Sequence, residues 1–332
     1  MRKSLRNILI LVAVLLALTV VYAWYSYTDA VDLGSRIVSI IIMPGDSFTS
    51  VAEKLIAEGV VKSKSTLIVS ARLTGVDRKL TPGRYDFWGR NSCRSVLDKL
   101  TRADFVRVKV TIPEGTTIWK VASIVAEKLD LDSSVIVALN QDTVFLESLG
   151  LPCLEGYLFP ETYIFPWGLS ERDVVRQMVV QYREQTEHLW PDSQGKGMTP
   201  HEVMILASII EAETKLDSER TLVSSVYYNR LRKAMRLQAD PTVIYGLGGL
   251  DRPLYQNDLK KDTPYNTYLH KGLPPTPINS PGLAAIKAAL NPDETDYLYF
   301  VANEAGGHYF SRTNAEHNRA KSRIKTAKQL LK

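Results

Sequence analysis

The chain has 332 residues, of which 45% are hydrophobic and 23% charged. These fractions exclude a disordered chain, a collagen-like repeat and a multi-span membrane protein, and the length suggests about two domains. Basic residues outnumber acidic ones by 41 to 36, a mild excess. The basic residues near the C-terminus read as a solvated helix face, without the aromatic and basic alternation of a nucleic-acid site. Two cysteines exclude a disulfide scaffold and a C-x-x-C zinc site, while a Cys93–Cys153 bridge stays open.

The N-terminus predicts a membrane anchor. Residues 1–7 carry three basic side chains, and residues 8–25 form an uncharged, mostly apolar run. A helix of that length rises roughly 27 Å, enough to cross a bilayer core. Trp24, Tyr25 and Tyr27 stand where an interfacial aromatic belt lies. The basic flank places residues 1–7 in the cytoplasm and the rest of the chain outside it.

A cleaved signal peptide is the alternative interpretation of this segment. The apolar run is longer than the usual signal-peptide core, and no A-x-A site follows it. A weak candidate, Val21-Tyr22-Ala23, leaves cleavage open.

Residues 37–155 contain an internal repeat. The segments 45–52 and 115–122 both follow β-rich stretches, and both predict a glycine turn, a Ser or Thr cap and an amphipathic helix. Small β-α units of this kind resemble LysM modules, which bind glycans that contain N-acetylglucosamine. A spacer domain without binding activity is the alternative.

A buried helix is predicted to begin at residues 199–202, Thr-Pro-His-Glu, which form a capping box with proline in the first turn. Residues 203–210 are almost wholly apolar, and the helix ends in the segment 211–214, Glu-Ala-Glu-Thr. A carboxylate at the end of a buried helix loses solvation, which raises its pKa toward that of a general acid. The alternative is that Glu211 only marks where a core helix meets water.

The C-terminal third is rich in tyrosine. Nine of the 16 tyrosines lie between residues 227 and 309, around a proline-rich loop at residues 272–282. Tyrosine with Asn and Gln suits a sugar-binding cleft, because rings stack on pyranose faces and amides bind hydroxyls; a tyrosine-rich core is the alternative. A β-hairpin at residues 297–311 and a terminal helix complete an α+β fold.

Five ordered motifs then resemble the endolytic murein transglycosylase family, the YceG-like proteins also called MltG. They are residues 206–214, 238–246, 265–268, 272–275 and 297–301. The resemblance implies a YceG-like catalytic domain at residues 156–332, after the transmembrane helix at residues 8–25 and the LysM-like region at residues 37–155. It also implies a bacterial plasma (inner) membrane protein whose catalytic domain is periplasmic or otherwise extracytoplasmic.

The resemblance implies a lyase reaction with Glu211 as the catalytic residue. Protonated Glu211 would protonate the oxygen between N-acetylmuramic acid and N-acetylglucosamine. Its carboxylate would then take a proton from the C6 hydroxyl of the muramoyl residue, which closes on the anomeric carbon to leave an anhydro end. Such an enzyme would act in cell-wall biogenesis and in the termination of glycan strands.

Other residues of the motifs are interpreted as substrate contacts. Glu213 lies about 200° around the helix from Glu211, so a structural or supporting role is also open to it. For Asp240, a capping role is the alternative. The candidate substrate-binding residues are Glu213, Asn229, Gln238, Asp240, Tyr265, Asn266 and Tyr268.

No cofactor or metal is expected, because the five histidines lack ligand spacing. The expected partners are peptidoglycan glycan strands, the membrane and, through the resemblance, the cell-wall synthases, with no nucleic acid. Two other functions stay open: a muramidase that uses water and leaves a reducing end, and a non-catalytic wall-binding scaffold.

Overall fold

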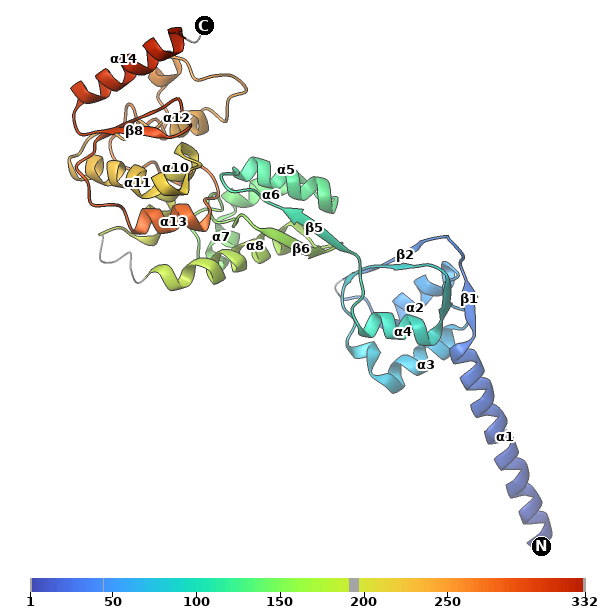
Figure 1. Ribbon diagram of the computed structural model, residues 1–332. Helices are drawn as coiled ribbons and strands as arrows, with labels where there is room; N and C mark the ends of the chain where they lie inside the picture. The colour runs from blue at the N-terminus through green and yellow to red at the C-terminus, as the bar shows by residue number, and fades with distance from the viewer. Residues whose placement is uncertain (1, 44, 191–196, 331–332) are drawn as a thin grey trace. The chain divides into compact units, whose positions relative to one another are not determined.

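The computed structural model describes residues 2–43, 45–190 and 197–330 (Figure 1). They form two compact units. Unit 1 comprises residues 1–109 and 164–169, and unit 2 comprises residues 110–163 and 170–332. The elements mix helices with short strand pairs, so the predicted α+β class is confirmed.

Helix α1, Arg2–Thr28, is the predicted apolar helix. Among the described residues it is the one helix long and apolar enough to cross a membrane, and none of its apolar window is buried. Soluble proteins rarely expose an apolar surface of this extent. The helix is therefore consistent with a membrane anchor.

Unit 1 packs helices against two antiparallel strand pairs. Alternate residues of β2 are buried, as expected of a strand with one face on a core. Ser47 caps α2 by accepting the Ser50 N–H, so the first repeat segment has the predicted local structure. The pairs are β1 (Ala30–Asp32) with β4 (Arg90–Ser92) and β2 (Val38–Ile42) with β3 (Gly83–Phe87), and the helices are α2 (Phe48–Ala57), α3 (Lys64–Thr74), η1 (Val76–Arg78) and α4 (Cys93–Thr101).

The second repeat segment also has the predicted helix, which belongs to unit 2, but the predicted side-chain cap is wrong there, because the Thr117 side chain makes no capping hydrogen bond. Units 1 and 2 thus meet in the sequence between residues 109 and 110. The predicted domain boundary, between residues 155 and 156, lies inside unit 2. The LysM-like character of residues 37–155 stays a prediction. The elements are β5 (Arg107–Thr111), α5 (Ile118–Leu129), α6 (Ser133–Ala138), η2 (Leu139–Gln141), α7 (Thr143–Ser148), β6 (Thr162–Pro166), which pairs with β5, α8 (Glu171–Thr186) and η3 (Glu187–Leu189).

Helix α10, Pro200–Glu213, is the centre of unit 2. Its predicted capping box between Thr199 and Glu202 is present, and residues 203–210 are all buried. A helix that is apolar on every side has to be covered on every side. Helix α10 contacts α11 (Asp217–Arg232), α12 (Asp240–Gly246) and α13 (Leu283–Leu290).

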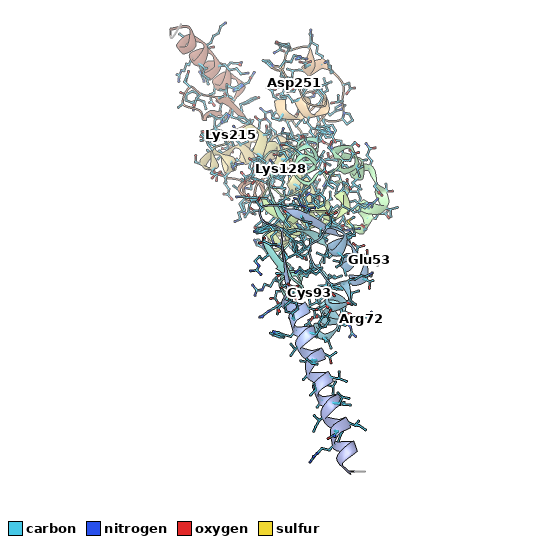
Figure 2. All side chains as sticks on the ribbon, turned by 90° about the vertical axis from the view of Figure 1, so that its right-hand side faces the viewer. Glu53, Arg72, Cys93, Lys128, Lys215 and Asp251 are labelled. Atoms are coloured by element: carbon cyan, nitrogen blue, oxygen red, sulfur yellow. The ribbon has the colours of Figure 1, made fainter. Side chains whose placement is uncertain are left out.

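The chain then closes as predicted with a hairpin and a helix, and α14 packs on β7 and β8 (Figure 1). Figure 2 labels Lys128 in the last turn of α5, Lys215 just after α10 and Asp251 in the loop after α12. The remaining elements are α11 (Asp217–Arg232), α12 (Asp240–Gly246), η5 (Asp258–Lys260), α13 (Leu283–Leu290), β7 (Tyr299–Ala302), β8 (His308–Ser311) and α14 (Asn314–Leu330).

Both cysteines are free and buried, so the open question of a Cys93–Cys153 bridge is answered in the negative. Burial raises the pKa of the Cys153 thiol to about 12, which keeps it protonated and unreactive.

Candidate functional site

A cavity of about 440 Å³ lies at the C-terminal end of α10. Its wall combines one carboxyl from α10 with aromatic, amide and basic groups from five other segments. Four of the predicted site residues line it: Glu213, Gln238, Asp240 and Tyr268. The other lining residues include Tyr227, Arg230, Leu237, Tyr299, Phe300, Val301, Ala302, His308, Asn314, His317, Asn318 and Lys321.

Glu213 is the carboxyl that α10 contributes to this cavity. Tyr227 on α11 donates its Oη proton to Glu213 Oε1 over 2.8 Å. Burial raises the pKa of Glu213 to about 7, and the negative charge of Asp240 acts in the same direction, against the Tyr227 hydrogen bond. Burial thus favours the protonated form of Glu213, which is the form that a general acid requires.

Arg230 places a buried guanidinium in the same wall. Its Nε donates to Leu298 O over 2.7 Å and its Nη1 to Leu237 O over 2.5 Å. The guanidinium also lies 5.3 Å from the centre of the Tyr299 ring. Its charge favours the ionised form of Glu213, so the cavity accommodates both protonation states of that carboxyl.

Asp240 and Gln238 lie at the start of α12. Tyr268 donates its Oη proton to Asp240 Oδ1 over 2.5 Å. Gln238 has a φ of +50°, a left-handed backbone that costs a non-glycine residue roughly 1–2 kcal/mol. Its N–H donates to Thr267 O over 3.1 Å, which helps to hold this conformation. Strained backbone of this kind clusters at functional sites.

Glu211 lies in different surroundings, on the other side of α10. Its Oε2 is 3.0 Å from Arg220 Nη1 and accepts the Gly282 N–H over 3.0 Å. The side chains of Glu211 and Arg220 are 7% and 6% exposed. Partial burial and the charge of Glu211 raise the pKa of nearby Glu114. A Cβ at position 282 would overlap the Glu114 carboxylate, so a larger residue there would require the Glu114 side chain to move.

The other three predicted site residues lie outside the cavity wall. The Asn229 amide donates to Thr295 O and Tyr297 O, and the Asn266 amide donates to Leu259 O and Lys261 O. The Tyr265 hydroxyl forms a hydrogen bond with Thr276 Oγ1 over 2.8 Å. In this structure all three connect loops to one another or to α11.

Sequence reasoning missed Tyr227, Arg230 and His308 as site residues. Tyr227 and Arg230 lie three positions apart on α11, so they share a helix face, and that spacing was a usable signal. His308 comes from the hairpin, and only the tertiary fold brings it to the cavity. Among the described residues, no group of three or more His, Cys, Asp or Glu could hold a metal ion.

Comparison with known proteins places the chain in a family. The YceG-like family model matches residues 40–323. An endolytic murein transglycosylase of Bacillus subtilis (strain 168) is 33% identical over 310 residues, which cover 88% of this chain and 86% of the relative. The chain belongs to the YceG-like family, as its motifs predicted.

A second relative and a solved structure agree. An endolytic murein transglycosylase of Streptococcus pneumoniae (strain D39) is 30% identical over 72% of this chain and 50% of the relative. A crystal structure of a YceG-like protein from Listeria monocytogenes aligns with a TM-score of 0.61 and 31% identity, covering 85% of this chain and 98% of that one.

The Glu211–Arg220 pair yields a stability prediction. Arg220→Ala leaves the Glu211 carboxylate buried without its partner, and such a loss costs about 3–5 kcal/mol. Arg176→Ala is the matched control, because Arg176 pairs with Asp173 on the surface, where a pair contributes about 0–1 kcal/mol. Urea unfolding of both variants tests this, and equal, small losses would show that the buried pair is not structural.

Proposed function

We propose that this protein is an endolytic lytic transglycosylase of peptidoglycan. It cleaves the bond between N-acetylmuramic acid and N-acetylglucosamine within a glycan strand and leaves an anhydro-muramoyl end. Membership of the YceG-like family and the names of the relatives support the class of reaction. The observation that carries the proposal is the position of the Glu213 carboxyl, whose pKa burial raises, in a cavity lined by hydroxyl, amide and aromatic groups.

The geometry favours Glu213 over Glu211 as the acid and base. Both belong to the segment that the family resemblance singled out, and that resemblance pointed to Glu211. Yet Glu211 Oε2 is already bound to Arg220 and Gly282, and its side chain is almost fully covered. Glu213 lines the cavity of about 440 Å³, whereas Glu211 is not part of its wall. Glu211 then has a structural role, in which it holds α11 and the residue 282 loop against α10.

One carboxyl is enough for the reaction. Glu213 donates its proton to the glycosidic oxygen as the bond to the muramoyl anomeric carbon breaks. The Glu213 carboxylate then accepts the proton of the muramoyl C6 hydroxyl, whose oxygen bonds to that same carbon. No water is consumed and Glu213 ends protonated, unlike the two-carboxylate glycosidases. Arg230 stabilises the carboxylate between the two transfers, and Tyr227 orients it.

The apolar helix α1 supplies the location. As an anchor it holds the N-terminus in the cytoplasm and unit 2 outside the membrane, in keeping with the basic residues that precede it. An anchored enzyme meets glycan strands as they are made, so we place the cell-wall synthases among its partners. Cleavage there would terminate new strands.

A pair of matched variants tests the assignment. Glu213→Gln removes the transferable proton and should reduce turnover roughly 10²- to 10⁴-fold, the usual contribution of general acid–base catalysis. Glu211→Gln should keep turnover within a few-fold at temperatures below its unfolding transition. The measurement is mass spectrometry of purified glycan strands after digestion, with thermal unfolding as the control for folding.

Each other outcome of this experiment would indicate a different catalytic residue or a different function. Loss of turnover in a folded Glu211→Gln protein, with Glu213→Gln active, would move catalysis to Glu211. Reducing ends would identify a muramidase. An absence of cleavage by the unsubstituted protein would favour the wall-binding scaffold.

The raised pKa of Glu213 predicts the pH dependence. The acid is active while protonated, so kcat/KM should fall about tenfold per pH unit above a pKa near 7. Asp240→Asn removes a negative charge that raises this pKa, so it should move the alkaline limb to lower pH. The pH profiles of kcat/KM for both proteins check this, and an unmoved alkaline limb would show that another group titrates there.

A further inference from the structure

A second cavity, of about 540 Å³, is lined by other residues of the same two chain segments. Its wall is more apolar than that of the Glu213 cavity, and it is formed by the start of α5, by α12 and by residues 278–279. Ala212 and Pro241 line it, whereas the adjoining Glu213 and Asp240 line the first cavity. Consecutive residues at the end of α10 and at the start of α12 therefore line different cavities.

Two aromatic rings form one wall of this second cavity. Trp119 and Tyr245 are stacked, with ring centres 5.0 Å apart and an interplanar angle of 30°. Tyr265 lies edge-on to Tyr245 at 4.8 Å and supports it from another side. Trp119 stays 41% exposed. An exposed indole on a supported stack presents a flat apolar surface to a ligand.

A single buried carboxylate holds both rings in place. Both Glu155 oxygens accept the N–H of Ile118, the residue before Trp119, over 3.1 and 3.2 Å, and Glu155 Oε2 accepts the Tyr245 hydroxyl over 3.0 Å. Thr117 makes no side-chain cap, so Glu155 replaces the usual N-cap of α5. Glu155 is 1% exposed, and burial raises its pKa to about 7. Burying a carboxyl costs free energy. This cost is easier to explain if the position of the two rings matters for function than if the rings only fill space.

We propose that this second cavity is a saccharide subsite, in which Trp119 stacks on a pyranose ring of the glycan strand that the enzyme cleaves. The inference rests on the proposed function and extends it to substrate recognition. The apolar faces of pyranose rings match flat indoles, and binding sites of this kind combine an apolar wall with few polar groups. Thr117, Lys120 and Asn279 provide those groups here. Glu155 acts as a positioning residue that fixes the platform.

Binding without turnover is the first test. Full-length Glu213→Gln protein in detergent micelles is titrated calorimetrically with purified peptide-free glycan strands. Trp119→Ala in that background should weaken binding roughly tenfold, the usual contribution of an aromatic stacking platform. Trp119→Phe should retain most of the affinity. Tyr255→Ala is the matched control, because Tyr255 is an exposed aromatic of unit 2 outside both cavities, and it should bind normally. Unchanged affinity of the Trp119→Ala protein would overturn the subsite.

A second measurement does not depend on that variant folding. In protein with ¹⁵N-labelled indoles, the Trp119 Nε1–H resonance, assigned by its absence in Trp119→Phe, should shift on addition of glycan strands. An unshifted resonance at saturating strand concentration would contradict the proposal.

Cleavage kinetics separate this inference from the proposed function. In the catalytically intact chain, Trp119→Ala should raise KM with little change in kcat, because stacking on the platform contributes equally to binding of the ground state and the transition state. If Glu213→Gln still cleaves while the Trp119 results hold, the catalytic assignment fails and the subsite stands. If Glu213→Gln abolishes cleavage and Trp119→Ala changes neither affinity nor KM, the reverse follows.

Discussion

The burial of helix α10 on every side is the constraint on which unit 2 depends. Eight consecutive buried residues leave this helix no solvent face, so α11, α12 and α13 have to surround it. Its last turn is then fixed from several directions at once. Glu211 and Glu213, two residues apart and about 200° around the axis, necessarily enter different surroundings.

Three carboxyls of unit 2, those of Glu155, Glu211 and Glu213, are covered by the protein and have three different roles. Glu211 is paired with Arg220 and a backbone N–H, which gives a stable structural contact. Glu155 replaces a helix cap and binds a tyrosine hydroxyl. Glu213 keeps one hydrogen bond and faces a cavity, which leaves its proton available for transfer. Burial raises the pKa of both Glu155 and Glu213 to about 7, and of these two carboxyls only Glu213 lines the first cavity.

Much of this was readable from the sequence, because the signals were local. The capping box at Thr199 and Glu202, the apolar run of residues 203–210 and the hairpin each depend on neighbouring residues, and all three are confirmed. The different faces of Glu211 and Glu213 followed from helix geometry alone. Four of the eight proposed site residues line one cavity, because the motifs that carry them surround the end of α10.

The rest required the tertiary structure. Nothing local predicts that Arg220 reaches Glu211, nine residues earlier, or that Glu155 binds both Ile118, 37 residues earlier, and Tyr245, 90 residues later. Asn229 and Asn266 have the residue type of sugar ligands, yet here their amides are used to hold backbone carbonyls. The residue type predicts which hydrogen bonds a side chain can form. Only the tertiary structure determines whether it forms them with a ligand or with other groups of the protein.

The central claim is that Glu213, and not Glu211, meets the scissile bond. A crystal structure of the Glu213→Gln protein with a glycan strand bound tests it most directly. The account predicts a glycosidic oxygen within hydrogen-bonding distance of the side chain at position 213, with the Glu211–Arg220 pair intact. A strand whose glycosidic oxygen instead contacts Glu211, with that pair opened, would contradict it.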